Sequence, residues 1–187
     1  MTVYIRQLQH DAYSNACEKG WHERPVKQDG VIDHDRVLAK LLLVHSEVSE
    51  AWDARNAHSV DDIRMRVING KPEGFAVEIA DAVIRMLDLC GALDIDLADY
   101  VDTSWPAVDP STFVGYRDEL HRARFLIDKA GEAVRVDDWP GFANALGEVM
   151  VKLALICKFA RVDLVEAITV KMTYNKTRPH RHGGKKA

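Results

Sequence analysis

The sequence has few cysteines, no long apolar run and no basic body, and each shortage excludes a class of protein. Its three cysteines, Cys17, Cys90 and Cys157, lie far apart and show no C-x-x-C spacing. Neither a zinc site nor a redox motif is therefore indicated, and we expect reduced thiols. No segment approaches the length of a membrane-spanning helix, and residues 1–6 lack the organisation of a signal peptide. We predict a cytoplasmic protein with no membrane partner.

The charge is unevenly distributed along the chain. Residues 171–187 carry six lysines and arginines and no acid, and removing those six charges from the net charge of −4 leaves −10 on the other 170 residues. Nucleic-acid-binding domains carry a basic body, so we expect no nucleic-acid partner. The basic tail is expected either to fold back onto the acidic body, or onto a phosphate held there, or to remain a solvated chain end.

The apolar pattern predicts an all-α helical bundle. An apolar content of 47% over 187 residues is enough for a real core, and no strand pattern competes with the helical spacing. A linker with two prolines is expected at Thr103–Ser111. It separates a first helical half, residues 1–102, from a second, residues 103–175, and we expect the two halves to pack into one compact domain. Residues 176–187 form a basic tail. Long helices are expected at 3–19, from Asp33 or Asp35 to about Asn56, and at 75–92, 111–135, 141–160 and 164–174. Shorter helical turns are expected at Ser59–Arg66 and Asp94–Val101, and a turn at Ile68–Gly74.

The two halves resemble each other weakly. A shift of 67 positions pairs Phe75 with Phe142 and Cys90 with Cys157. In this register Asp81 meets Glu148, while Glu78 meets an alanine. The pattern is typical of a degenerate internal duplication, and chance similarity between two apolar helices explains it nearly as well.

Two acidic pairs stand out on the predicted helices. Glu47 and Glu50 belong to the second helix, and Glu78 and Asp81 to the third. Residues spaced i, i+3 project from one side of a helix, so each pair places two carboxylates close together. The third helix is otherwise apolar nearly all round, which predicts a buried element crossed by a narrow polar stripe.

Carboxylates on a buried helix need a cation, and two kinds are available. Arg85, four residues after Asp81, predicts a structural salt bridge within the third helix. That pair would account for one acid only. We therefore favour a divalent cation held between the two acidic pairs, because buried carboxylates are costly unless paired or metal-bound.

The acidic spacing and two flanking segments resemble one enzyme family. The chain resembles the MazG-like members of the all-α nucleoside triphosphate pyrophosphohydrolases, which are relatives of dimeric dUTPases and phosphoribosyl-ATP pyrophosphatases. The resemblance lies in Glu47-x-x-Glu50 and Glu78-x-x-Asp81, in residues 69–85 and in the tail at 174–185. The family motif usually begins with two adjacent glutamates. Here Ser46 replaces the first, which removes one expected acid.

The resemblance implies a metal-dependent hydrolase. It assigns Mg²⁺, with Mn²⁺ as an alternative, to four ligands, which are Glu47, Glu50, Glu78 and Asp81. Products would be a nucleoside monophosphate and pyrophosphate, and implied substrates include dUTP, non-canonical nucleotides and ordinary nucleoside triphosphates. Glu47 or Glu50 would serve as ligand or would orient the attacking water. Assembly as homodimers or homotetramers is also implied.

Several further residues are candidates for substrate contact. The resemblance places the end of the last helix near the substrate phosphates, and Lys71 precedes the third helix; the phosphate-binding candidates are Lys71, Lys171, Tyr174, Asn175, Lys176 and Arg178. Trp21 and His22, in a loop after the first helix, are candidates for a nucleobase wall, although an aromatic ring that covers a helix end is the commoner arrangement.

Two other functions compete with the hydrolase. A ferritin-like di-metal oxidase needs Glu-x-x-His pairs, and here Glu50 and Asp81 stand where histidine would be. Oxygen-only ligation also favours Mg²⁺ or Mn²⁺ over iron or zinc. A non-catalytic helical protein whose acidic stripe binds a metal or a basic partner is the second alternative.

Overall fold

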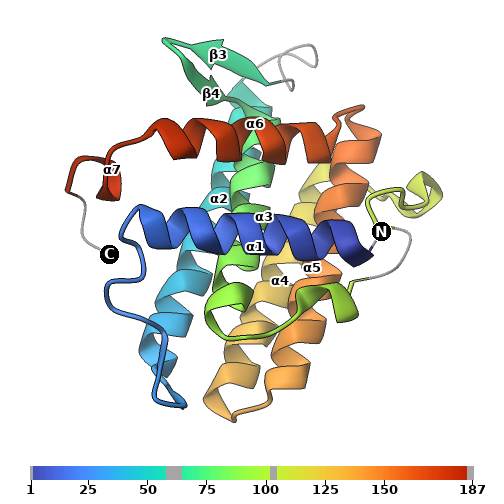
Figure 1. Cartoon of the computed structure of the whole chain (residues 1–187). Helices are drawn as coiled ribbons and strands as arrows, with labels where there is room; N and C mark the ends of the chain where they lie inside the picture. The colour runs from blue at the N-terminus through green and yellow to red at the C-terminus, as the bar shows by residue number, and fades with distance from the viewer. Residues whose placement is uncertain (1, 58–64, 102–104, 185–187) are drawn as a thin grey trace.

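The computed structural model describes residues 2–57, 65–101 and 105–184, and these fold as an all-α protein, as predicted (Figure 1). The α-helices are α1 (Thr2–Glu18), α2 (His34–Ala57), α3 (Phe75–Ala92), α4 (Tyr116–Arg135), α5 (Trp139–Phe159), α6 (Leu164–Thr177) and the short α7 (Arg181–Gly184). Two 3₁₀ helices, η2 (Leu97–Asp99) and η3 (Pro110–Thr112), lie between α3 and α4. The predicted helix at Asp94–Val101 is thus reduced to η2, and α4 begins five residues later than expected.

Two short hairpins, which the sequence pattern does not predict, accompany the helices. Strands β1 (Lys27–Gln28) and β2 (Val31–Ile32) pair antiparallel, as do β3 (Arg66–Ile68) and β4 (Lys71–Glu73). Both connecting turns have two residues with positive φ, Asp29-Gly30 and Asn69-Gly70, which is the geometry that two-residue hairpins favour. The expected turn at Ile68–Gly74 is therefore a hairpin end. The expected helical turn at Ser59–Arg66 lies outside the described residues except for Arg66, which belongs to β3.

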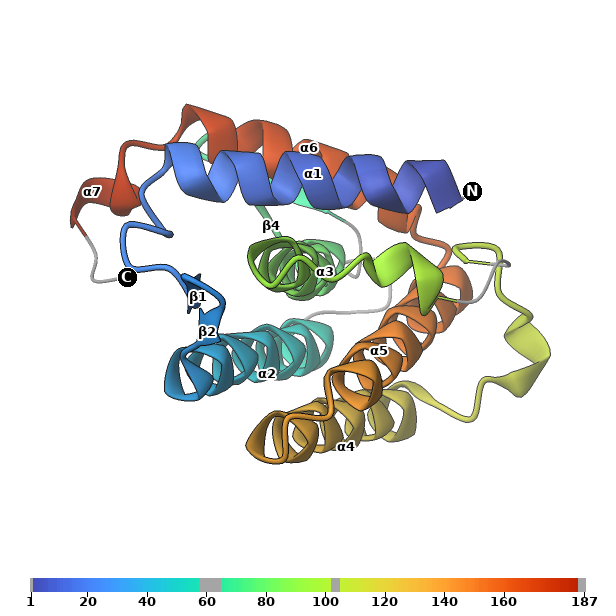
Figure 2. The ribbon, with the colours of Figure 1, turned by 60° about the horizontal axis from the view of Figure 1, so that its bottom comes forward.

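Helix α3 occupies the centre of the molecule. Figure 2 shows it between a layer formed by α1 and α6 and a second layer formed by α2, α4 and α5; α3 contacts α1, α2, α5 and α6. Before its last two residues, only its four charged side chains are less than fully buried, namely Glu78, Asp81, Arg85 and Asp88. The prediction of a buried helix with one narrow polar stripe is confirmed.

The sequence sets the start of the helices through capping aspartates. Asp33 accepts a hydrogen bond from the backbone N–H of Arg36 (3.1 Å) at the start of α2. Asp138 and Asp163 cap α5 and α6 in the same way. A capping carboxylate satisfies backbone donors that have no partner within the helix, so each helix begins at a defined residue. This fixes which residues of α2 and α6 face α3.

Trp105, in the predicted linker, is part of the core. Its side chain is fully buried, and its Nε1 donates a hydrogen bond to the carbonyl of Met150 (3.0 Å). The apolar core is continuous and includes residues from both predicted halves, such as Ile79 and Leu153. Residues 102–104 of the linker lie outside the described residues.

Gly147 in α5 has no room for a side chain, and this yields a stability prediction. A Cβ at Gly147 would lie 2.2 Å from the carbonyl oxygen of Tyr100, which is backbone. We expect Gly147→Ala to lower the free energy of unfolding by about 1–3 kcal/mol, as overpacking does. Gly131→Ala in α4 is the matched control, because there the new Cβ would meet Leu38 at an ordinary 3.5 Å. Removing a helical glycine should stabilise that variant by roughly 0.5–1 kcal/mol. Urea denaturation measures both, and equal shifts would contradict the packing described here.

The segment after α6 folds back onto the end of α1. Arg181 donates from its backbone N–H to the carbonyl of Lys19 (2.9 Å) and from Nε to the carbonyl of Gly20 (3.1 Å). Its guanidinium also pairs with Glu23, and the ring of His182 packs edge-on against Trp21, with centroids 5.0 Å apart. The basic segment up to Gly184 is therefore docked on the body of the protein.

Within the described part of the chain, no helix combines the length and the apolar character needed to cross a membrane.

Candidate functional site

The sequence predicts that four carboxylates from α2 and α3 converge, and in the structure three of the four do so. Carboxylate oxygens of Glu47, Glu50 and Glu78 lie within 4.8 Å of one another. The two helices run antiparallel, because Lys40 of α2 pairs with Asp88 of α3 while Glu47 pairs with Arg85. The i, i+3 spacing of Glu47 and Glu50 points both side chains at α3, and Glu78 faces them near the start of that helix.

Asp81, the fourth predicted ligand, is engaged by a lysine from α6. Its Oδ2 lies 2.6 Å from Nζ of Lys171, and the two side chains are only 16% and 7% exposed. This buried ion pair joins the third helix to the sixth, ninety positions apart in the sequence. Asp81 is one helical turn from Glu78, and its charge raises the pKa of Glu78.

Arg85 does not form the predicted bridge within α3. Its guanidinium reaches across to Glu47 instead, with Nε and one terminal nitrogen 2.7 and 2.6 Å from Oε1. Ser46, which stands where the resembled family has an acid, donates from Oγ to Oε1 of Glu50 (2.9 Å). Arg85 and Ser46 therefore hold the orientation of the two acids on α2.

The electrostatics of the acid cluster favour the binding of a cation. Burial raises the pKa of Glu78 to about 7, and the charges of Asp81 and Glu47 add to this effect. Burial also raises the pKa of Glu47, against the opposing charge of Arg85. The pKa of Asp81 is raised by its burial despite the ion pair with Lys171. These carboxylates repel one another in a poorly solvated place, which a divalent ion would relieve.

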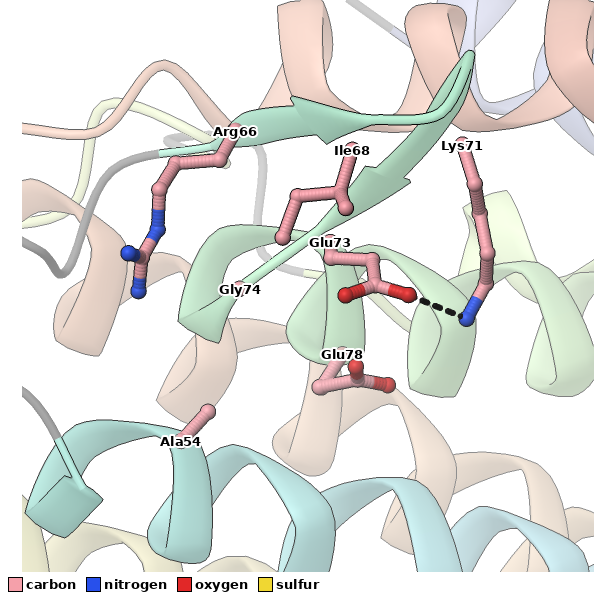
Figure 3. Close-up of a pocket in the computed structure, with 7 residues that line it drawn as sticks. All are labelled: Ala54, Arg66, Ile68, Lys71, Glu73, Gly74 and Glu78. Atoms are coloured by element: carbon pink, nitrogen blue, oxygen red, sulfur yellow. Dashed lines mark hydrogen bonds and ion pairs between the residues drawn. The ribbon is translucent and has the colours of Figure 1, made fainter.

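A small cavity lies under the β3–β4 hairpin, with Glu78 in its wall (Figure 3). It encloses about 290 Å³, and its charged lining residues are Arg66, Lys71, Glu73 and Glu78. Lys71, a predicted phosphate contact, points into this cavity but is paired with Glu73 (2.8 Å). The hairpin thus brings positive groups to one side of the acid cluster.

A larger cavity of about 550 Å³ lies among α1, α2, α3 and α6. Asp81 and Arg85 line it, so it adjoins the acid site. Three predicted substrate contacts also line it, namely Lys171, Asn175 and Arg178. Trp21, which the sequence analysis gives as a candidate nucleobase contact, is part of its wall. Glu78 thus lines the smaller cavity, and the larger cavity adjoins the cluster through Asp81 and through Arg85, the partner of Glu47.

The other predicted contacts lie elsewhere. His22 is outside the wall of the larger cavity; its Nε2 is 2.5 Å from Asp88, and the side chain is nearly buried. Tyr174 is half-buried, with the guanidinium of Arg178 5.8 Å from its ring centroid. The side chain of Lys176 is exposed, and its backbone carbonyl accepts a hydrogen bond from Nζ of Lys19 (2.7 Å).

No protein-family model, curated protein or solved structure matches the chain.

The donor set fits a hard divalent cation. Glu47, Glu50 and Glu78 offer only oxygen ligands, which Mg²⁺ and Mn²⁺ prefer. The group combines one buried, one half-buried and one exposed carboxylate, so it is open to solvent on one side. Asp81 lies outside this group, and its Oδ2 is paired with Lys171.

Sequence reasoning did not assign several polar residues of the larger cavity to a site. Asn15, Arg36 and Lys40 line it. Asn15 carried a usable signal: it follows Leu8 by seven positions and Ala12 by three, so a polar residue interrupts the apolar stripe of α1. A buried polar residue in such a stripe indicates a partner for its side chain.

Proposed function

We propose that the protein is a divalent-metal-dependent nucleoside triphosphate pyrophosphohydrolase. The observation that carries the proposal is the convergence of Glu47, Glu50 and Glu78 near two cavities that both contain lysine and arginine side chains. Neither cavity alone points to this reaction. An acid cluster near two cavities that contain cations suits a ligand whose phosphate groups lie at the cluster and are cleaved there.

The chain's own residues have distinct parts in this reaction. Glu47, Glu50 and Glu78 would hold the ion, which when bound would neutralise phosphate charge and assist attack by water. Lys171 and Arg178 face the larger cavity and Lys71 the smaller one, so cations in both cavities are available to bind phosphate oxygens. Glu50 is exposed and Ser46 holds its Oε1, which leaves Oε2 available to orient a water molecule.

The bond changes are those of a simple hydrolysis. The water oxygen forms a bond to the α-phosphorus, and the bond from that phosphorus to the oxygen bridging to the β-phosphorus breaks. Nucleoside monophosphate and pyrophosphate result, with one proton released to solvent. We place the nucleoside side of the substrate in the larger cavity and the leaving pyrophosphate towards Lys71.

A pyrophosphate-release screen tests this function. Purified protein is incubated with each common ribo- and deoxyribonucleoside triphosphate, including dUTP, with Mg²⁺ or Mn²⁺ or with a chelator. We expect metal-dependent release of pyrophosphate from at least one substrate. Absence of release from all of them, with either metal, would reject the hydrolase and favour a helical protein that uses its acid cluster to bind a basic partner.

The pH dependence of metal binding gives a second prediction. A carboxylate ligand must lose its proton to bind a metal, and Glu78 in the metal-free protein has a pKa of about 7. Below that pH the proton competes with the ion, so we expect the affinity for Mg²⁺ to be about tenfold weaker at pH 6 than at pH 8. Titration calorimetry with Mg²⁺ alone at the two pH values measures the difference. Equal affinities would place the ion away from Glu78.

A further inference from the structure

Three residues in the wall of the larger cavity carry buried polar atoms that have no hydrogen-bond partner within the described residues. The atoms are Oδ1 of Asn15, Oδ1 of Asn175 and Nε of Arg36. Asn15 is 8% exposed. A buried polar group without a hydrogen-bond partner destabilises the folded protein, so three beside one cavity indicate a ligand that supplies hydrogen bonds.

The apolar part of the wall includes three alanines, and a leucine and an isoleucine complete it. Ala12 and Ala16 come from α1, Ala39 and Leu43 from α2, and Ile84 from α3. Small residues on facing helices leave a space that a flat ring can enter. Trp21 supplies an aromatic surface in the same wall, and stacking on such a surface favours planar ligands.

The charge of the cavity favours an anion attached to that ring. Two acids line it, and both are paired: Asp81 with Lys171, and Asp88 with Lys40 and His22. Three further cations, Lys19, Arg36 and Arg178, line the same cavity. The unsatisfied polar atoms, the apolar and aromatic wall and the excess of cations together favour a ligand that is planar, rich in hydrogen-bonding groups and negatively charged.

We propose that this cavity binds the base and sugar of the substrate nucleotide, and that Asn15 recognises the hydrogen-bonding edge of the base. The inference rests on the proposed function for the identity of the ligand. The terminal torsion of an asparagine side chain is soft, so the Asn15 carboxamide turns to a base edge at little cost. A site with a buried amide that needs a partner discriminates between bases, because a mismatched edge leaves that amide unpaired. Asn15 is thus a specificity residue.

Binding without turnover tests the assignment. Wild-type protein and Asn15→Leu are titrated by calorimetry, in chelator, with the adenine, cytosine, guanine and uracil nucleoside monophosphates. We expect the wild type to prefer one base, and the variant to bind that monophosphate at least tenfold more weakly. Inorganic tripolyphosphate, which has the charge but no base, should bind both proteins within about twofold of each other. Asn144→Leu, the same change at an exposed site on α5, is the control and should match the wild type.

A stability measurement separates recognition from a structural role. Leucine has the shape of asparagine without its unsatisfied oxygen, so ligand-free Asn15→Leu should unfold at the same or a higher temperature than the wild type. A variant that binds normally, a wild type that binds no monophosphate, or an equal loss for tripolyphosphate would overturn the assignment. The proposed function is tested separately: preferential monophosphate binding that needs Asn15, without release of pyrophosphate from any triphosphate, supports the cavity assignment and rejects the hydrolase.

Discussion

Replacing Glu78 by glutamine is expected to lower the rate of pyrophosphate release by about 10²- to 10³-fold. Glu78 is the α3 member of the acid cluster, opposite Glu47 and Glu50. A bound metal stabilises transition-state charge by several kcal/mol, and each ~1.4 kcal/mol corresponds to a tenfold change in rate. Glutamine keeps the size of the side chain and removes the charge that holds the ion. Initial rates of pyrophosphate release at saturating Mg²⁺ measure the effect.

Two controls show whether such a loss is specific. At pH 8, above its pKa of about 7, Glu78 is ionised in the folded protein, although its burial disfavours the charged form. Because the unfolded chain ionises it more easily, the folded state loses stability as the pH rises from about 4.5 to 7. Metal-free Glu78→Gln should therefore melt at the same or a higher temperature at pH 8. Glu148→Gln, at an exposed position of α5, should leave the rate unchanged. A Glu78→Gln enzyme with full activity would remove this glutamate from the site.

Replacing Lys171 by methionine is expected to destabilise the metal-free protein by about 3 kcal/mol. The change leaves the Asp81 carboxylate, which is 16% exposed, without its 2.6 Å partner, and breaking one side of a buried ion pair typically costs about 3–5 kcal/mol. We choose the lower figure because the charges of Arg85 and Arg178 also act on Asp81. Urea denaturation at pH 7 in chelator measures the loss.

A second substitution shows whether the loss of stability in Lys171→Met comes from the unpaired Asp81. Adding Asp81→Leu to Lys171→Met removes both charges and should recover most of the stability, since apolar replacement of a whole buried pair is often neutral or favourable. The deficit of the single variant should also shrink as the pH falls, because an unpaired Asp81 gains a proton more readily in the folded state than in the unfolded chain. Lys158→Met, exposed on α5, is the matched control. A Lys171→Met protein within 1 kcal/mol of the wild type would contradict the ion pair.

The features that sequence reasoning predicted are those set by local periodicity. The apolar wheel of α3 and the i, i+3 acidic pairs depend on spacing within one helix, and the structure has both. The partner of Asp81 was not predictable, because Lys171 approaches it only through the packing of α6 on α3. For the same reason Arg85 was assigned to Asp81, its neighbour along the helix, whereas it reaches Glu47.

The tight turns and the connection between α3 and α4 were harder to predict than the helices. Asn69-Gly70 signals a tight turn, but the strands on each side have three residues each and too little alternation to be recognised. Trp105 lies between residues that suggest a linker, and its burial depends on a hydrogen bond to Met150, on a helix formed later in the chain. The larger cavity is assembled from α1, α2, α3 and α6, so no single stretch of sequence describes it.

The Lys171–Asp81 pair has a consequence for how the chain folds during synthesis. The acids of α2 and α3 leave the ribosome first, while the lysine that neutralises Asp81 follows ninety residues later. Until α6 docks, the half-built domain holds excess negative charge near its centre. Docking of this late helix supplies the missing positive charge and, in the same step, completes the wall of the cavity.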